Sequence, residues 1–342
     1  MFPEDAYEAA RDAGVLEPGH LEAVRDELSA IRPMKAAFQS QYVRRLEGRH
    51  VKRTSNKAEL VEQLREDIRD TLAAQECDRA VGLWCGSTEV HGCRRRRAPE
   101  RGGLPSGARA QRSGHHQLAL YAWAHLEEGV PFANCSPNLA VDFPAALELA
   151  EARGIPVGGK DLKTGQTLKK TVVAPALRAR ALGVKGWFST NILGNRDGMV
   201  LDDPESFRSK ELTKRGVLDS ILDAEAHPEL YGELFHKVRI EYYPPRGDAK
   251  EGWDNIDLVG WMGYPMQLKL NFLCRDSILA APLVLDLALL LDLAARSGLS
   301  GMQEWMGYFF KHPMAPEGAR AENDLFRQLS TLEDTIRALG RA

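Results

Sequence analysis

The sequence predicts an α/β protein made of two parts, and three observations lead to this class. Short apolar strands that end in polar loops alternate with helical segments over the first half of the chain, which is the pattern of a parallel sheet. The stretch 258–273 alternates apolar and polar residues, as strands buried on one side do. Long helices return at 276–297 and 323–339. We therefore expect a parallel sheet, followed after about residue 205 by a different, partly antiparallel sheet.

The composition is that of an ordinary soluble globular enzyme. With 342 residues, of which 44% are hydrophobic and 27% charged, the chain is long enough for two domains and a large core. The formal net charge of -3 gives no reason to expect a nucleic-acid or membrane partner. The first residues lack the basic and apolar regions of a signal peptide.

The five cysteines predict neither a disulfide framework nor a metal site. They stand at 77, 85, 93, 135 and 274, and none forms a Cys-x-x-Cys pair, so a reducing environment is expected. Cys85, His91 and Cys93 are candidate metal ligands, but no fourth ligand follows at a convincing spacing. We therefore expect a cytoplasmic location and no metal.

One apolar run, 277–295, is nearly long enough to cross a membrane. Asp286 and Asp292 interrupt it before it reaches the ~20 apolar residues that a membrane span needs. The run is therefore predicted to be a buried helix.

The other elements follow from hydrophobic periodicity and turn signals. Asn56 and Glu59 resemble a capping box before a helix over about 57–75, whose apolar residues recur on one face. AVGLWC (80–85) predicts a short buried strand that ends in a polar turn, and ligands bind outside such strand ends in parallel sheets. The same reasoning predicts helices at 4–13, 18–30, 117–130, 142–153 and 168–182, and strands at 130–134, 154–159, 184–190 and 237–245.

The segment 92–116 interrupts this pattern. It holds seven arginines, a single acid and one leucine among many Gly, Pro and Ala residues. Three interpretations are open: an arginine-rich nucleic-acid or targeting segment, a solvated loop, or a local shift of the reading frame in GC-rich DNA. Because helix signals resume at once at 117, the composition favours the shifted frame.

Candidate chemistry begins with a turn and a lysine pair. Thr164, Gly165 and Gln166 directly precede a helix, where free backbone N–H groups and the helix dipole favour an anion. A tight turn without a ligand is the alternative. Lys210 and Lys214 are four residues apart and share one face if the segment is helical. Such a pair suits proton transfer or enolate stabilisation, although it also occurs simply as solvated charge.

Three further residues are candidates, each with a structural alternative. Lys250 stands close to Asp248 in the string RGDAK. Asp276 opens the long apolar helix, where helix capping is the alternative role. Lys311 follows an aromatic run, and its alternative is to lie along apolar surface with its amine in water. The motifs of serine hydrolases, zinc hydrolases and P-loop proteins are absent from the sequence.

Six strings together resemble the myo-inositol-1-phosphate synthase family. They are GGKDLKTGQT, NILGNRDG, FRSKELTK, PRGDAK, CRDSILAAPLVLDL and FFKHP, in this order and at consistent spacing. LWCGSTE and VPFANCSPN resemble two further family blocks, so the resemblance covers nearly the whole chain except 92–116. It implies an NAD-dependent but redox-neutral reaction. In that reaction glucose 6-phosphate is oxidised, enolised, closed by an intramolecular aldol step and reduced again to inositol phosphate.

The same resemblance assigns roles to individual residues. The expected catalytic residues are Lys210, Lys214, Lys250, Lys311, Asp161 and Asp276, which would hold the phosphate, move protons and stabilise oxyanions. The substrate phosphate would contact Thr164, Gly165, Gln166, Lys214 and Lys250. NAD would lie against Ser87, Thr88, Glu89, Asn134, Ser136, Asp161, Asn191, Leu193, Asn195, Asp197 and Asp248.

The sequence departs from the family pattern in three places. The family's first strand and its glycine-rich pyrophosphate loop have no counterpart in this chain. The segment 92–116 is unlike the family, and Cys135 replaces the glycine of an Asn-Gly-Ser-Pro block. We therefore expect a truncated NAD-binding half, with weak NAD binding and weak activity.

The resemblance implies two domains and a homo-oligomer. A discontinuous Rossmann-like NAD-binding domain would comprise 1–167 and 281–342. An α+β catalytic domain would comprise 168–280, with a mixed sheet whose largely exposed face builds a tetramer. Two alternatives are open. One is another NAD-linked sugar-phosphate dehydrogenase or isomerase, which a net change of NADH absorbance would reveal. The other is an inactive protein that oligomerises or binds nucleic acid.

Overall fold

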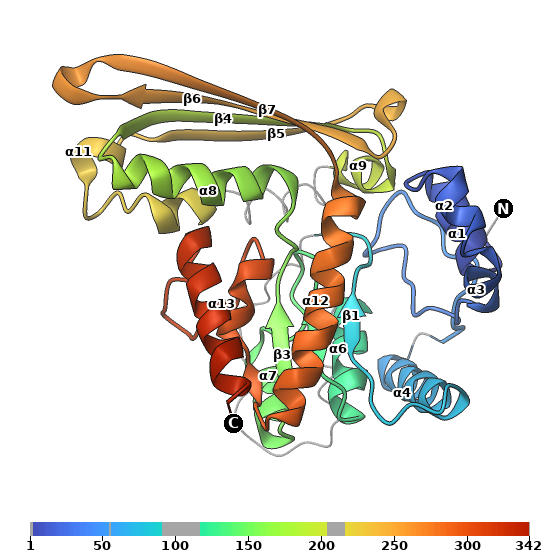
Figure 1. Ribbon diagram of the computed structural model, residues 1–342. Coiled ribbons are helices and arrows are strands. Elements are labelled where there is room, and N and C mark those ends of the chain that lie inside the picture. The colour runs from blue at the N-terminus through green and yellow to red at the C-terminus, as the bar shows by residue number, and fades with distance from the viewer. Residues whose placement is uncertain (1–2, 55, 91–116, 204–215, 342) are drawn as a thin grey trace.

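The computed structural model describes residues 3–54, 56–90, 117–203 and 216–341, and these residues form two sheets joined by helices (Figure 1). One sheet has the strand order β1-β2-β3-β8, and the other has the order β5-β4-β6-β7. The helix α12 (Asp276–Arg296) begins at the second sheet and runs down to the first. The predicted α/β class with a parallel sheet is therefore confirmed.

The first sheet is entirely parallel. Its strands are β1 (Gly82–Trp84), β2 (Phe132–Asn134), β3 (Pro156–Gly159) and β8 (Gly301–Met302). Successive side chains of β2 point to opposite faces: Phe132 packs in one apolar cluster and Ala133 in another. The first cluster includes α6 (Gln117–Glu127) and α7 (Pro144–Ala152), and the second includes α12 and α13 (Leu325–Leu339). Burial on both faces explains the short continuous apolar runs in the sequence.

The N-terminal region is helical, as predicted. The expected helix at 18–30 is divided into α2 (Pro18–Glu22) and α3 (Arg25–Ala30), and α1 (Ala6–Ala13) precedes them. α4 (Lys57–Ala74) begins at Asn56, whose side chain accepts hydrogen bonds from the backbone N–H groups of Ala58 and Glu59. The Glu59 side chain bonds to Thr54 and Gln63, so only half of the predicted capping box forms.

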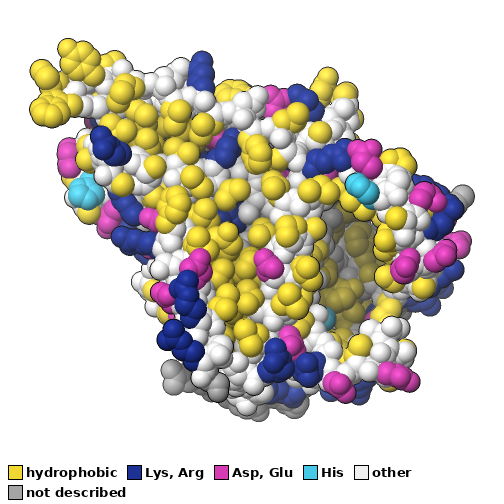
Figure 2. Space-filling model, in the orientation of Figure 1, with side chains coloured by type: hydrophobic (Ala, Val, Ile, Leu, Met, Phe, Trp, Pro, Cys, Tyr) yellow, Lys and Arg dark blue, Asp and Glu magenta, His cyan; other side chains and the backbone are white. Residues whose placement is uncertain are grey.

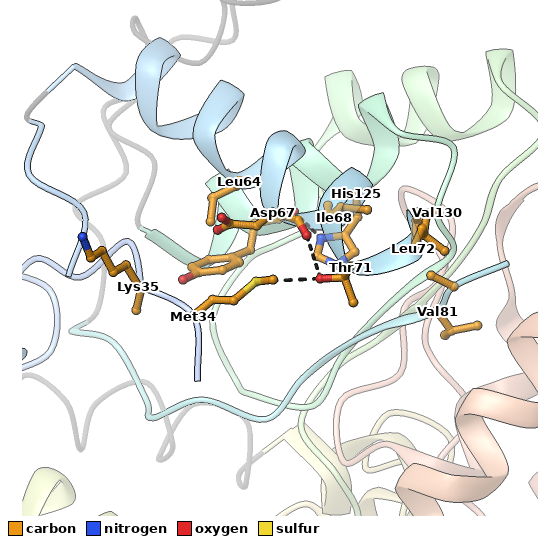
Figure 3. Close-up of a pocket in the computed structure, with 13 residues that line it drawn as sticks. Met34, Lys35, Leu64, Asp67, Ile68, Thr71, Leu72, Val81, His125 and Val130 are labelled. Carbon is orange, nitrogen blue, oxygen red and sulfur yellow. Dashed lines mark hydrogen bonds between the residues drawn. The ribbon is translucent and has the colours of Figure 1, made fainter. Parts of the chain in front are cut away.

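An apolar hollow lies between α4 and the residues just before β1. It measures about 310 Å³, and Leu64, Ile68 and Leu72 of α4 line it together with Val81 and Val130, of which Val130 lies beside Leu72 (Figure 3). None of the residues that line it is among the candidate site residues. This hollow is therefore not the candidate site.

The second sheet is mixed. Its strands are β4 (Gly183–Leu193), β5 (Phe235–Tyr242), β6 (Ala249–Val259) and β7 (Pro265–Arg275). β4 pairs in parallel with β5 and antiparallel with β6, and β6 pairs antiparallel with β7. The expectation that this sheet begins after about residue 205 was wrong, because its strand β4 already begins at Gly183. In the sequence, β4 is a buried strand that follows a helix, so it resembles one more unit of the parallel sheet.

Helix α8 (Gly165–Ala179) covers one face of the mixed sheet, where Ala174 and Leu177 pack on Trp187 and Ile256 (Figure 1). Alternate residues of β6 are buried on this side. The limits of the predicted domains, 167/168 and 280/281, fall inside α8 and α12 respectively, and the division into domains stays a prediction.

α12 is not the buried helix that was predicted. Only Leu287, Leu291 and Ala294 among its 21 residues are buried, whereas Leu285 and Leu289 are 60% and 61% exposed. Figure 2 shows apolar side chains gathered in the region of this helix. Its buried residues pack in the cluster that includes Ala133 of the parallel sheet, whereas Leu285 and Leu289 are not covered by the described residues. Among the described residues, α12 is the one helix with the length and composition of a membrane span.

Candidate active site

The N-termini of α8 and α12 meet beside β6. Nζ of Lys250, in β6, is 2.5 Å from Oδ2 of Asp276, the first residue of α12. A Cβ placed on Gly165, the first residue of α8, would lie 3.0 Å from Asp276 Oδ1 and 3.7 Å from Lys250 Nζ. Arg275 rather than Asp276 is the N-cap of α12, so the capping alternative for Asp276 was wrong.

The first turn of α8 has the properties of an anion site. Thr164 is the N-cap of this 15-residue helix but makes no side-chain capping hydrogen bond, so no cap satisfies the first backbone N–H groups. The helix dipole and the Lys250 amine both place positive charge here. Gly165 has a φ of +28°, which favours glycine, and a side chain there would fill the space beside Lys250. Gly165 and Gln166 belong to the first turn of the helix itself, not to a turn before it as predicted.

A second ion pair lies at the carboxyl end of the parallel sheet. Nζ of Lys311 is 3.1 Å from Oδ1 of Asp161, and the two side chains are 8% and 2% exposed. The backbone N–H of Lys311 donates to the carbonyl of Asp161 at 2.6 Å, and that of Asp161 donates to the carbonyl of Ser136 at 3.1 Å. This burial excludes the alternative in which the Lys311 amine reaches water. Since Thr164 follows Asp161 by three residues, one short loop links this pair to the anion site.

Two polar acceptors are left unpaired on the mixed-sheet side of the site. Asn191 Nδ2 donates to Gln166 Oε1 at 2.5 Å, and Asn195 Nδ2 donates to Asp248 Oδ1 at 3.2 Å. Oδ1 of Asn191 and Oδ2 of Asp248 are buried and make no hydrogen bond with the described residues. Buried acceptors normally have a donor, so these two atoms indicate a place for a ligand N–H or O–H group.

Three of the residues predicted for cofactor binding have clear structural positions nearby. Leu193 is buried at the end of β4, and Gly198 of α9 (Arg196–Leu201) packs closely against it. Asp197 is in the first turn of α9, and Asn195 caps that helix by accepting a hydrogen bond from the Gly198 N–H. Leu193 therefore shapes the site by packing.

The predicted residues that follow β1 and β2 form one buried hydrogen-bond network. Glu89 Oε1 accepts from the backbone N–H of Leu118 at 2.9 Å. The Asn138 side chain accepts a hydrogen bond from the backbone N–H of Glu89 and donates one to the backbone carbonyl of Glu89. Asn134 Nδ2 donates to the carbonyl of Asn138 at 2.6 Å. The Ser136 N–H and hydroxyl both donate to Asn134 Oδ1. Sequence reasoning missed Asn138, which joins the two strand-end loops.

Ser87 and Thr88 lie in the loop after β1, half-buried and buried respectively. Lys210 and Lys214 lie outside the described residues, and so does the segment 92–116. Their assignments stay predictions.

Sequence reasoning also missed a buried charged cluster beneath α8. Nζ of Lys169 is 2.7 Å from Oδ2 of Asp254, a fully buried carboxylate in β6. Oδ1 of Asp254 accepts hydrogen bonds from Ser189, Trp187 and Gln166 at 2.5, 3.0 and 3.3 Å. The available signal was the period of two in β6, which places Asp254 on the same inward face as Lys250. The cluster holds Gln166 next to the anion site.

We expect the buried amine of the neighbouring Lys170 to make the free energy of unfolding depend on pH in the alkaline range. Its Nζ is 2.6 Å from His236 Nε2, and burial lowers its pKa from 10.5 to about 7. Between these two pKa values, Lys170 is protonated in the unfolded chain but not in the folded chain. The free energy of unfolding therefore rises as the pH rises through this window, and the gain is lost as the pH falls to about 7. In the Lys170→Met variant the free energy of unfolding should rise less steeply with pH, and its slope should be smaller than that of the wild type by up to ~1.4 kcal/mol per pH unit.

Urea unfolding at pH 7, 8 and 9 measures this difference. Burial also lowers the pKa of Lys163 to about 7, so the variant keeps that lysine's contribution and its slope does not vanish. The exposed Lys185→Met variant should keep the full slope. Equal slopes in all three chains would refute the role of Lys170.

Sequence comparisons place the chain among known proteins. Residues 1–337 match the family model described as myo-inositol-1-phosphate synthase. The chain is 51% identical to inositol-3-phosphate synthase 1 of Bacteroides thetaiotaomicron, over 98% of this chain and 79% of that protein. It is 34% identical to inositol-3-phosphate synthase 1 of Bos taurus, over 97% of this chain and 62% of that protein. The chain thus spans less than two thirds of the length of the bovine relative.

Solved structures agree with these matches. The crystal structure of inositol-3-phosphate synthase from Caenorhabditis elegans is similar with a TM-score of 0.88 and 29% identity, over 98% of this chain and 68% of that chain. A myo-inositol-1-phosphate synthase-related protein from Thermotoga maritima has a TM-score of 0.71 at 21% identity, over 92% of this chain and 81% of that chain, and shows the fold alone. The chain belongs to the myo-inositol-1-phosphate synthase family.

Proposed function

We propose that this chain carries the active site of an inositol-3-phosphate synthase. The reaction is the NAD-dependent, redox-neutral conversion of glucose 6-phosphate to 1D-myo-inositol 3-phosphate, an isomerisation that supplies inositol and phospholipid synthesis. The observation that carries the proposal is the meeting of Lys250, Asp276 and the open first turn of α8 at one point. This arrangement suits a sugar phosphate, because a cationic amine and free backbone N–H groups converge there.

The described residues fit the nicotinamide end of NAD. The unpaired oxygens of Asn191 and Asp248 are acceptors, and a carboxamide NH₂ group supplies the donors that they lack. Bound there, NAD would supply the hydride acceptor for the oxidation and the hydride donor for the final reduction. Asn195 holds the Asp248 carboxylate in place, and Gln166 holds the Asn191 side chain. The remaining cofactor contacts proposed are Ser87, Thr88, Glu89, Asn134, Ser136, Asp161, Leu193 and Asp197.

The lysines would have separate roles in phosphate binding, oxyanion stabilisation and proton transfer. Lys250 and the first turn of α8, from Thr164 to Gln166, hold the substrate phosphate. Lys311, held by Asp161 in a site with little water, places positive charge where an enolate or aldol oxyanion develops. Asp276 holds the Lys250 amine toward the phosphate. Lys210 and Lys214, outside the described residues, are proposed to move protons and, in the case of Lys214, to contact the phosphate.

Turnover of glucose 6-phosphate with NAD by the purified 342-residue chain tests the proposal. Slow formation of inositol phosphate, without a net change in absorbance at the NADH wavelength, is expected. A steady rise in NADH would instead favour an NAD-linked sugar-phosphate dehydrogenase. Binding of glucose 6-phosphate without turnover would mean that the chain holds the substrate site but needs further protein for the cofactor. Failure to bind glucose 6-phosphate would refute the proposed site.

We also propose that the chain forms a homo-oligomer, expected to be a tetramer, in the cytoplasm. The support is the outer strand β7, where Met266 and Leu273 are 44% and 59% exposed, and the turn before it, where Trp261 is 89% exposed. Apolar exposure along one sheet edge is typical of an interface between copies. Sedimentation velocity should give about four times 38.0 kDa. Leu273→Lys should lower that mass, Leu289→Lys on α12 should not, and a monomeric wild type would contradict the proposal.

A further inference from the structure

Two cysteines lie side by side at the carboxyl ends of β1 and β2. Trp84 is opposite Asn134 in the parallel register, and the Cys135 N–H donates to the Trp84 carbonyl at 2.9 Å. Cys85 and Cys135 directly follow these paired strand ends, and each thiol shifts the pKa of the other. Neighbouring strands are ~4.8 Å apart, which lies within the Cα separation of about 4.4–6.8 Å that a disulfide spans.

The two thiols differ in exposure and in acidity. Cys85 is exposed, whereas Cys135 is half-buried and packs against the apolar cluster that includes Ala133 and Leu162. The hydrogen bond from Cys135 lowers the pKa of Cys85. The same hydrogen bond, together with burial, raises the pKa of Cys135. The outer sulfur is therefore the one that ionises, and the inner sulfur stays a thiol beside it.

The surroundings favour oxidation over metal binding. Within the described residues, no group of three or more His, Cys, Asp or Glu side chains is arranged to hold a metal ion. The other described cysteines have different neighbours: Cys77 bonds to the carbonyl of Gln75, and Cys274 lies near Asp276. In the described part of the chain, Cys85 and Cys135 are thus the one pair of cysteines that the strand register places side by side.

We propose that Cys85 and Cys135 are a peroxide-sensitive cysteine pair that closes reversibly to a disulfide. The Cys85 thiolate attacks hydrogen peroxide, so an S–O bond forms and the O–O bond breaks. The leaving hydroxide takes up a proton from the solvent, to which the Cys85 thiol had released one, and becomes water. The Cys135 sulfur then attacks the Cys85 sulfenic acid. The S–S bond forms, the S–O bond breaks, and the Cys135 proton leaves with the hydroxyl group as a second water. A dithiol reductant reverses the reaction by thiol–disulfide exchange.

The position of the pair gives the oxidation a structural consequence. Cys85 precedes Ser87 and Cys135 precedes Ser136, so the bond would lie between the two strand-end loops of the candidate cofactor site. It would also close a loop that contains residues 86–134. Closing a long loop restricts the unfolded chain, so the oxidised protein should unfold at a higher urea concentration than the reduced one. The proposal depends on the sheet geometry and not on the proposed activity.

Peptide mapping after oxidation tests the proposal. The reduced 342-residue chain is treated with equimolar hydrogen peroxide, blocked with N-ethylmaleimide and digested for mass spectrometry. We expect one linked peptide that joins Cys85 to Cys135 and disappears after treatment with dithiothreitol. Before oxidation, Cys85 should react with the maleimide roughly tenfold faster than Cys77, because its thiolate is more populated.

Three variants separate this mechanism from general surface oxidation. Cys135→Ser should leave Cys85 as a sulfenic acid that dimedone captures, whereas Cys85→Ser should leave Cys135 reduced. Cys77→Ser should behave as the wild type. Oxidation of Cys77 while Cys85 and Cys135 both stay reduced would overturn the proposal. So would links from Cys85 to several cysteines in similar yield. The maleimide rates are measured on the wild type, so the test does not depend on the variants folding.

Discussion

Replacing Lys250 by methionine should lower kcat/KM for glucose 6-phosphate by about 100- to 1000-fold, the usual effect of removing one preorganised electrostatic group from an active site. Methionine keeps the length of the buried stem but removes the charge that faces the first turn of α8. It also leaves the Asp276 carboxylate, 26% exposed, without its amine partner beside the phosphate position. The affinity for glucose 6-phosphate, measured by calorimetry, should fall with the turnover.

Lys269→Met is the matched control for this experiment. Lys269 lies on β7, the neighbouring strand, but it is exposed, and its partner in the β6–β7 register is Asn255 rather than Lys250. That variant should keep the wild-type affinity and rate. A Lys250→Met chain that binds glucose 6-phosphate as tightly as the wild type would remove Lys250 from the phosphate site. The calorimetric result decides this even when turnover is too slow to measure.

The Lys169→Met variant should lose about 3–5 kcal/mol of the free energy of unfolding, the cost of leaving a buried charge unpaired. Asp254 is fully buried, and Lys169, 13% exposed, is the cation that faces it. The hydrogen bonds from Ser189, Trp187 and Gln166 hold the carboxylate in place, so it cannot turn toward water. Urea unfolding at pH 7 measures the loss.

Three further chains identify the cause of that loss: Lys185→Met, Asp254→Asn, and the double variant of Lys169 and Asp254. Lys185→Met breaks an exposed pair with Glu233 and should cost no more than ~1 kcal/mol, as surface ion pairs do. The double variant Lys169→Met with Asp254→Asn should be less destabilised than the sum of the two single variants, because it leaves no buried charge. Additive losses would mean that Lys169 stabilises α8 by packing and not by its charge.

The sequence alone located most of the helices and strands. The capped helix after Asn56 and the strand GLW in the string AVGLWC depend on local signals, namely a capping residue and a short apolar run bounded by polar turns. Such signals act over a few neighbours and can be seen without the fold. The mixed sheet was harder, because β4 belongs to it through pairing with β6, more than fifty residues later.

Burial was the property that local patterns predicted least well. α12 is apolar around most of its circumference, which suggested a buried helix, yet only three of its residues are buried. Conversely, Asp254 and Lys170 are polar residues in polar strings, and both are buried because α8 lies on the inward face of β6. Which side of an element is covered depends on a partner that the element's own residues do not specify.

The sequence identified the residue types of the candidate site. They are a glycine at a helix start, lysines, aspartates and amides, and they occur in the order that the family resemblance predicts. The sequence by itself thus determined the family and the chemistry that these groups can perform. Only the tertiary structure decided the pairings, namely Lys250 with Asp276, Lys311 with Asp161, and Cys85 with Cys135. The physical reason is that charges and thiols act over a few ångströms, and only the packing of α8, α12 and the two sheets brings such distant residues that close.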